Sequence, residues 1–490
     1  MASIDPRTPV LVGVGIASDD AEASELMTRA LLEAASDAGA PHILGAIDRI
    51  AVPQGSWDYA DPARLVADGV GATGARTHLV ELGIPQQSLI NEALSAILDG
   101  SSEVAAVVGG EAKRWSRRPD AAETAQPGAV PDVVRHRAGT LLEPVEVATR
   151  LWDPVQQYAM IDNALRAADG LSIEEHRDEV AGLWARFNLV AQGNPRAAFP
   201  APMTAEEIAR PSPANRPLAF PYNKWHSTQW TVNQAAALLV CSAQAARRFG
   251  IAPDRWIFPR VGIESSQAMS LLRRERPHTW PAMGVLRRAA ATRIGRPIAE
   301  AELIEVYSCF PAAVRVQQRE LGLDRSGTPT LTGGMAFAGG PFNNFVFQAI
   351  AAMAAGLRAE PGWLGVVTTV SGLLTKPGLG VWSASPDGQV PLLGDLGDEA
   401  ARSTGVVEVV ETLDEYTGRA AVVTYTVTPD RLADAGEHDA ARWSRTVVVG
   451  DTEDGRRCVA ISEDPKVANQ AVTGELIGQP VAVKAGALTL

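Results

Sequence analysis

The stretch Thr332-Gly333-Gly334-Met335-Ala336-Phe337-Ala338-Gly339-Gly340-Pro341 is the most informative part of this chain. It contains two glycine pairs, ends at a proline, and is followed directly by Phe342 and then by Asn343 and Asn344. Asparagine is a common cap at the start of a helix. We therefore expect a helix over 344–357, and the largely apolar run at 364–370 predicts a buried strand after it.

The alternation of helix and strand also occurs upstream of this stretch, and again in the first part of the chain. The expected strands are 9–16, 47–53, 104–110 and 303–307, and the expected helices are 21–39, 87–98 and 285–294. This order predicts two related α/β halves, each with a mostly parallel sheet covered by helices. Any α/β protein shows such alternation, so a true duplication and a simple repeat of element types both stay open.

Two further regions differ from the halves in composition. Residues 115–225 are richer in Pro, Arg and polar residues and have weaker periodicity, which indicates a long insertion, and 231–249 is expected to be a core helix or a strand and helix. After about residue 396, short β-rich segments separated by turns predict a small β-barrel; these segments are 406–410, 420–428, 446–450 and 457–461. The predicted domains are a first half (1–114 and 226–265), an inserted loop domain (115–225), a second half (266–395) and a β domain (396–490).

Composition excludes several classes of protein. The chain has 490 residues, 46% of them hydrophobic and 21% charged, as in ordinary globular proteins. The chain contains no uninterrupted run of ~18 apolar residues, so we expect no membrane span. The N-terminus lacks the features of a signal peptide. The three scattered cysteines predict neither a disulfide framework nor a metal site, and fit a reducing cytoplasm. A net charge of −13 argues against nucleic acid as a partner.

The stretch 332–341 resembles the Gly-Gly-x-x-x-x-Gly-His-Pro signature of thiolases, with Gly340 at the position of the histidine that activates the catalytic cysteine. The resemblance covers about residues 5–390. It is nearest to actinobacterial thiolase-like proteins, often labelled acetyl-CoA acetyltransferases, and to the sterol-carrier-type thiolase branch. It implies a duplicated thiolase fold, with two βαβ halves in five layers and an inserted loop domain. The terminal domain resembles the OB-fold domains that accompany thiolase-like proteins as subunits or fusions.

Two other motifs match further catalytic positions of thiolases. In thiolases the helix before the strand at 104–110 starts with the nucleophilic cysteine, because a helix N-terminus favours the thiolate. That position matches Gly83, and no cysteine lies nearby. The segment 305–310 resembles the thiolase loop whose first catalytic residue holds a water or the thioester oxygen. Here that residue is Tyr307, whose hydroxyl can donate a hydrogen bond or act as acid or base. Cys309 is expected in the core.

The last motif is the glycine-rich turn at 370–380, where thiolases carry their second cysteine and this chain has none. Lys376 lies in this turn and is expected at the surface. Asn343 and Asn344 are further candidates, either facing the pocket or capping a helix. The resemblance also implies that coenzyme A lies along the inserted domain, where a basic cluster is a weak candidate for its phosphates; the cluster consists of Arg114, Arg117 and Arg118, and a solvated face is the alternative.

Three functions follow from the resemblance. The leading one is a thiolase-like protein that binds CoA or acyl-CoA without standard thiolase activity, acting without metal, nucleic acid or membrane as a monomer or homodimer. The second is a retro-aldolase acting on a β-hydroxyacyl-CoA, as in thiolase-like enzymes of steroid side-chain degradation, with Tyr307 as the acid or base. The third is an ordinary acetyl-CoA C-acetyltransferase, which lacks a visible nucleophile and base.

Overall fold

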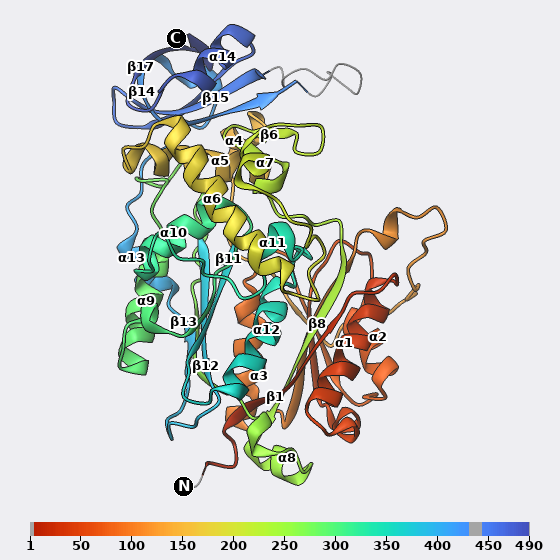
Figure 1. Ribbon diagram of the computed structural model, residues 1–490. Coiled ribbons are helices and arrows are strands. Elements are labelled where there is room, and N and C mark those ends of the chain that lie inside the picture. The colour runs from red at the N-terminus through yellow and green to blue at the C-terminus, as the bar shows by residue number, and fades with distance from the viewer. Residues whose placement is uncertain (1–3, 431–442, 490) are drawn as a thin grey trace.

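The chain forms two central β-sheets with helices on both sides of each, and a separate small barrel at its C-terminal end (Figure 1). The computed structural model describes residues 4–430 and 443–489. Within these residues, none of the helices combines the length and the apolar character needed to cross a bilayer.

The first sheet has the strand order β1-β8-β4-β2-β3-β5. Its strands are β1 (Pro9–Ala17), β8 (Asn233–Ser242), β4 (Val104–Ala112), β2 (Arg49–Pro53), β3 (Arg76–Val80) and β5 (Val133–Arg135). Strands β4, β2, β3 and β5 run parallel to one another, whereas β8 is antiparallel to β1 and β4. Every residue of β4 and β8 is buried, which explains why both read as continuous apolar runs.

The second sheet has the order β10-β11-β12-β9-β13. Its strands are β10 (Leu303–Glu305), β11 (Gly365–Ser371), β12 (Lys376–Ser383), β9 (Phe258–Glu264) and β13 (Leu392–Asp395). Strand β9 lies within the 226–265 segment of the sequence-based first half and pairs in this second sheet. It is therefore the strand that carries the chain from one half to the other.

The helices make the layers that the thiolase resemblance implies. Helices α3 (Gln86–Asp99) and α12 (Phe345–Ala359) contact strands of both sheets and so lie between them. Helices α1 (Ala23–Asp37) and α2 (Pro62–Val70) cover the outer face of the first sheet, and α9 (Pro281–Ile294) covers that of the second, with α10 (Pro311–Leu321) beside it. The order helix, sheet, helix, sheet, helix is visible in Figure 1 and confirms the mixed α/β fold.

The insertion is more helical than its weak periodicity indicates. It contains α4 (Pro144–Ala148), α5 (Pro154–Ala168), α6 (Ile173–Gln192) and α7 (Ala205–Ala209), and the short strands β6 (Pro217–Ala219) and β7 (Tyr222–Asn223). In Figure 1, α5 and α6 lie between the two-sheet core and the barrel. Both helices bury charged and amide side chains as well as apolar ones, and this mixture obscures their apolar period in the sequence. The remaining short helices are α8 (Ala243–Arg248), α11 (Gly334–Phe337) and α13 (Gly397–Ser403).

The C-terminal domain is a closed barrel of order β14-β15-β16-β18-β17. Its elements are β14 (Thr417–Pro429), β15 (Trp443–Thr452), β16 (Arg457–Ser462), α14 (Pro465–Thr473), β17 (Pro480–Lys484) and β18 (Ala487–Thr489). Three of the four expected strands are confirmed here. The strand expected at 406–410 is wrong, because that segment forms only isolated bridges, first to Arg274 of the second half and then to Arg457 of β16.

Buried polar contacts join the barrel to α5. Thr424 donates a hydrogen bond to the carbonyl of Met160 (2.5 Å), and Asn163 donates to the carbonyl of Tyr425 (3.0 Å). Arg166, which is fully buried, forms an ion pair with Glu475 of the barrel at 2.5 Å. These contacts satisfy polar groups that would otherwise be costly to bury, so the barrel is an integral part of the fold.

Candidate functional site

The sequence position matched to the thiolase nucleophile lies in a turn just before α3. Gly83 has φ +97°, a left-handed conformation that favours glycine, and Gln86 is the first helical residue after the cap Pro85. The segment 82–87 contains no cysteine. The start of this buried helix therefore offers no thiol, whichever of these residues is taken as the matching position.

The starts of α3 and α12 face each other and are joined by hydrogen bonds. The amide nitrogen of the Gln86 side chain donates to Oδ1 of Asn343 (3.2 Å), and the backbone N–H of Val346 donates to Oε1 of Gln86 (2.8 Å). Asn344 is fully buried at the cap position of α12, but its side chain does not cap the helix. Its amide donates instead to the carbonyl of Gln234 (3.5 Å). The structure thus brings Asn343, but not Asn344, into contact with the start of α3.

Gly340 leaves no room for a side chain. A Cβ atom added there would lie 2.1 Å from Cγ2 of Thr228 and 3.3 Å from the methyl group of Met335. The backbone N–H of Gly340 donates to the carbonyl of Gln229 (3.0 Å), which holds the two segments together. A histidine at this position would require the 228–229 segment to move, so the local packing is built around glycine.

Tyr307 lies beside the start of α12. Its backbone is held on both sides, by Thr368, which accepts from its N–H (2.8 Å), and by Gln317, which donates to its carbonyl (2.8 Å). Its ring meets Phe345 edge to face, with ring centres 5.8 Å apart. Burial raises the pKa of Tyr307 well above its usual range. Among the described residues its hydroxyl has no hydrogen-bond partner, so a protonated phenol is available as a donor.

All three cysteines are buried and unsuited to nucleophilic chemistry. Burial raises the pKa of Cys241 and Cys309 to about 12 and that of Cys458 to about 11. Cys309 lies close to Tyr307 and to Tyr158 of α5. Because only the thiolate is nucleophilic, these thiols are inert near neutral pH.

Lys376 is buried, which corrects the expectation that it lies at the surface. Only 3% of the residue is exposed, and its ammonium donates to the carbonyls of Gly83 (3.2 Å) and Ala138 (3.3 Å). Burial lowers the pKa of Lys376, and the charges of Arg137 and Arg135 lower it further. Lys376 therefore brings a positive charge to the turn before α3 and connects that turn to β12.

The turn between β11 and β12 has a strained backbone and is stabilised by hydrogen bonds from two side chains of the second half. Leu373 and Leu374 have φ values of +57° and +64°, which non-glycine residues rarely adopt. Arg274 donates to the carbonyl of Leu373 (2.5 Å), and the indole N–H of Trp280 donates to the carbonyl of Thr375 (3.2 Å). Sequence reasoning missed both residues, because a loop arginine and a helix-capping tryptophan carry no motif.

The basic cluster proposed for phosphate binding lies on the surface. Arg114, Arg117 and Arg118 are exposed, at the short 3-10 helix that follows β4. Arg118 is already paired with Asp20 and Asp120, each at 2.9 Å. No contact joins these arginines to the helix starts within 4–430 and 443–489. In the same residues, no group of three His, Cys, Asp or Glu side chains is arranged to hold a metal ion.

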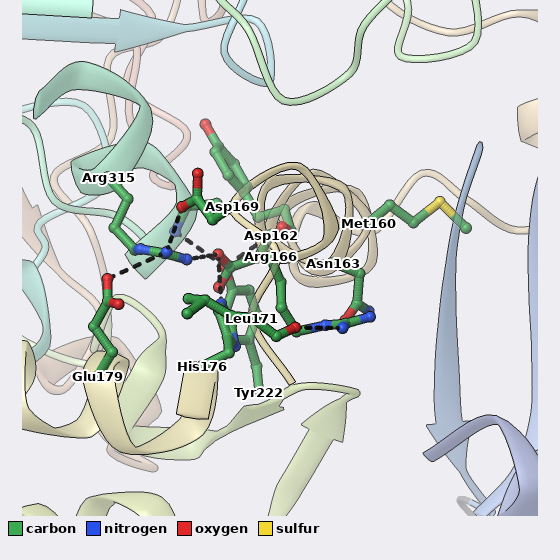
Figure 2. Close-up of polar contacts among 12 residues, drawn as sticks. Met160, Asp162, Asn163, Arg166, Asp169, Leu171, His176, Glu179, Tyr222 and Arg315 are labelled. Atoms are coloured by element: carbon green, nitrogen blue, oxygen red, sulfur yellow. Dashed lines mark hydrogen bonds and ion pairs between the residues drawn. The ribbon is translucent and has the colours of Figure 1, made fainter. Parts of the chain in front are cut away.

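A buried charge cluster fixes the insertion against the second half, and sequence reasoning missed it. Asp162 of α5 accepts from His176 of α6 and from Arg315 of α10, each at 3.1 Å (Figure 2). Arg315 also reaches Asp169 (3.1 Å) and Glu179 (3.2 Å). Since these residues are distant in sequence, no spacing pattern predicts their pairing. The cluster locks α5 against α10.

The same helix, α5, carries a tyrosine to the candidate site. The hydroxyl of Tyr222 donates to the backbone carbonyl of Tyr158 (3.4 Å), and both rings stack on Phe310. Tyr158 in turn reaches Cys309, next to Tyr307. The insertion thus packs directly against the segment 307–310.

Comparison with known proteins identifies solved structures with the same fold. No model of a known protein family matches the sequence, and no curated protein matches it. Among solved structures, a monomeric SCP2-thiolase-like protein of type 1 from Mycobacterium smegmatis is similar over 98% of both chains, with 27% identity and a TM-score of 0.81. The chain therefore has the SCP2-thiolase-like fold over 98% of its length, and the described part includes the C-terminal barrel.

Two shorter neighbours share only the fold. An aldolase described as Ltp2-ChsH2(DUF35) is 18% identical, with a TM-score of 0.56, and acetyl-CoA acetyltransferase from Syntrophomonas wolfei is 16% identical, with a TM-score of 0.57. Each match covers 78% of this chain and 100% of the neighbour. The thiolase fold is thus shared with proteins of different chemistry, and the site must be argued from its own residues.

Proposed function

We propose that this thiolase-like protein binds CoA or acyl-CoA thioesters and carries out no cysteine-dependent acyl transfer. One observation carries the proposal: the positions matched to the cysteine and the histidine of thiolases are Gly83 and Gly340, and neither position accepts a side chain without strain or collision. A Claisen reaction by the thiolase route needs a thiolate and a base. Because the thiolate and the base are both missing, we propose that the site binds its ligand or acts on it without a covalent intermediate.

The charge around the start of α3 supports an acidic or carbonyl ligand. Lys376 is buried there without a carboxylate partner among the described residues, and Arg137 lies over Gly83, with its Cδ 3.7 Å from where a Cβ would be. A helix N-terminus adds partial positive charge to the same place. A thioester oxygen or a phosphate would be stabilised at such a position.

Calorimetric titration of the full chain with CoA and acetyl-CoA tests the proposal. We expect saturable binding of at least one ligand, and weaker binding by an Arg137→Ala variant, whose side chain is exposed and whose loss should leave the fold intact. Arg419→Ala, at an exposed position of β14 in the barrel, is the matched control for a general loss of positive charge. Absence of saturable heat with both ligands would show that the proposal is wrong.

Thiolysis of acetoacetyl-CoA is predicted to stay at the uncatalysed background. The three cysteines are buried and protonated, so Cys309→Ala should leave that background unchanged. The measurement is the loss of acetoacetyl-CoA absorbance in the presence of free CoA. Turnover above background that disappears in Cys309→Ala would instead identify Cys309 as a nucleophile.

A second candidate is retro-aldol cleavage of a β-hydroxyacyl-CoA, favoured by the unpartnered hydroxyl of Tyr307. In this reaction the β-hydroxyl loses its proton, the carbon–carbon bond breaks toward the thioester, and the resulting enolate takes up a proton. A phenol with a raised pKa stays protonated and suits the proton-donor role. If this reaction occurs, Tyr307→Phe should lower kcat by about 100-fold or more.

The assay for Tyr307 measures release of a ketone or aldehyde from a branched β-hydroxyacyl-CoA. Tyr416→Phe, in the barrel, is the control for loss of a tyrosine hydroxyl away from the helix starts. Full turnover in Tyr307→Phe would show that the Tyr307 hydroxyl is not the acid or base of the reaction. The CoA-binding proposal would not be affected by this result, because calorimetry tests it separately.

We also infer that the protein is a monomer. Thiolases usually dimerise through core strands, and here the edge of β3 is already paired with β5 of the insertion. The sheet then ends in β5, which is three residues long, and such a short edge strand offers few free hydrogen-bonding groups to a second chain. Light scattering after size exclusion should give the mass of one chain, 51.7 kDa; a dimer mass at micromolar concentration would contradict this inference.

A further inference from the structure

A small cavity of about 120 Å³ lies behind the strained turn between β11 and β12. It forms where α9, the turn and α13 meet, so it lies beside the segment that leads to the barrel. The residues that matter for its chemistry are Arg274, Trp280, Leu374, Thr375, Ala400 and Thr404. Its volume is enough for several water molecules or for a small organic anion.

Arg274 brings an incompletely satisfied charge to this cavity. The residue is 5% exposed, and one terminal nitrogen donates to the carbonyl of Leu373. Its Nε and its other terminal nitrogen have no hydrogen-bond partner in the described part of the chain. Burial lowers the pKa of Arg274 to about 10, so the guanidinium is still charged at neutral pH.

The neighbouring acceptors are engaged elsewhere. The carboxylate of Glu146, which influences Arg274 electrostatically, accepts from the backbone N–H of Glu143 (2.7 Å) and from the amide of Gln157 (3.2 Å). The hydroxyl of Tyr158, the other titratable group near Arg274, supplies no negative charge at neutral pH, because burial raises the pKa of Tyr158 well above its usual range. A buried guanidinium without a hydrogen-bonded counter-ion is costly, so an anion that reached it would be stabilised.

The walls of the cavity limit which anion fits. Trp280, Leu374 and Ala400 are almost fully buried and present apolar surface. The small hydroxyl-bearing residues of the lining are Thr279, Thr375, Ser403 and Thr404. The exposed side chains Gln267 and Arg276 line the outer part, so a solute can reach the cavity from solvent. The exposed Glu275 and Arg276 there carry opposite charges.

We propose that this cavity is a binding site for a small carboxylate with a short apolar tail, held by the guanidinium of Arg274. The planar fork of an arginine matches a carboxylate, and the apolar walls favour a hydrocarbon tail over a fully hydrated inorganic ion. The site is separate from the space around Tyr307 and does not depend on the CoA-binding proposal.

The position of the site also couples it to the turn. Arg274 holds the carbonyl of Leu373, Trp280 holds that of Thr375, and the next residue, Lys376, reaches Gly83 before α3. A carboxylate bound to Arg274 therefore contacts a residue that supports the turn. Occupancy is expected to stabilise the turn and, with it, the whole fold.

The test is thermal unfolding of the full chain in sodium butyrate, compared with sodium chloride and sodium phosphate at equal ionic strength. We expect a saturable rise in Tm with butyrate only, confirmed as binding by calorimetry. The rise should be lost in Arg274→Gln. No saturable rise with butyrate, or an equal rise with phosphate, would overturn the carboxylate site.

A second variant keeps the test decisive if Arg274→Gln does not fold. Ala400→Leu fills the cavity from α13 and leaves the arginine in place, whereas Ala401→Leu enlarges the next residue of the same helix, which does not line the cavity. Butyrate should still raise the Tm of Ala401→Leu and should not affect that of Ala400→Leu. A butyrate-dependent rise that persists in Ala400→Leu would place binding elsewhere and overturn the proposal.

Discussion

Replacing Asp162 by alanine is expected to lower the free energy of unfolding by about 3–5 kcal/mol. Asp162 is completely buried and accepts from His176 and Arg315, each at 3.1 Å (Figure 2). Its removal would leave the buried side chain of Arg315 with less compensating charge and would create a small void between α5 and α10. Breaking a buried ion pair by removing one partner is costly because the other charge stays buried.

Urea denaturation measures this effect, and an exposed pair supplies the control. Asp178 pairs with Arg177 at the surface, with 70% of its side chain exposed, so Asp178→Ala should change stability by less than about 1 kcal/mol. A loss below about 1 kcal/mol for Asp162→Ala would mean that the cluster contributes little and that apolar packing alone holds the insertion.

The pH dependence gives a second measure of the same cluster. Burial alone would raise the pKa of Asp162, but His176 and Arg315 outweigh burial and hold this pKa at about 2. A carboxyl group whose folded pKa lies below its unfolded value of about 3.9 adds stability above that value. This contribution is lost as the pH falls from about 4 to about 2, and Asp162→Asn should flatten that part of the stability profile.

Replacing Gly340 by alanine is expected to cost about 1–3 kcal/mol, because the added methyl group would collide with Thr228. The collision is with Cγ2, so Thr228→Ser relieves it and keeps the hydroxyl that donates to the carbonyl of Cys309 (3.1 Å). A double-mutant cycle should therefore show a favourable coupling of about 1 kcal/mol or more between the two changes. Purely additive losses would contradict the packing argument.

Restoring the thiolase histidine is expected to fail for the same reason. Gly340→His adds a larger side chain at the collision and should destabilise the chain more than alanine does. Adding Gly83→Cys would not rescue activity, because Gly83 has φ +97°, where a cysteine is strained. Thiolysis of acetoacetyl-CoA by the double variant should stay at background, and measurable turnover would show that the frame still supports the older chemistry.

Much of the fold could be predicted from local patterns. The buried strands β1, β4 and β11 are short apolar runs, and the central helices α3 and α12 have a helical period and clear ends. These signals lie within about 20 residues of sequence, so they need no knowledge of the partner surface. The segment at 406–410 forms no strand because it passes from the second half to the barrel: Val406 bridges to Arg274, whereas Val409 bridges to Arg457 and Val410 packs in the barrel core.

The chemistry of the candidate site was only partly predictable. The absence of cysteine near Gly83 and of histidine at Gly340 is a property of the amino-acid sequence itself. The burial of Lys376 and the unpartnered nitrogens of Arg274 depend on contacts between segments far apart in the chain. No spacing rule covers such contacts, because a lysine or an arginine in a loop looks the same in sequence whether it is solvated or buried.

The amino-acid sequence by itself determined the main helices and strands of the two α/β halves, the presence of a β-rich terminal domain and the loss of thiol and imidazole, since each is a local property or a plain residue identity. Only the tertiary structure decided that Gly340 is closed in by Thr228, that Asp162 pairs with Arg315, and that Arg274 borders a cavity. The physical reason is that burial, steric collision and charge pairing depend on contacts between residues that are distant in the sequence. These contacts exist only once the chain has folded.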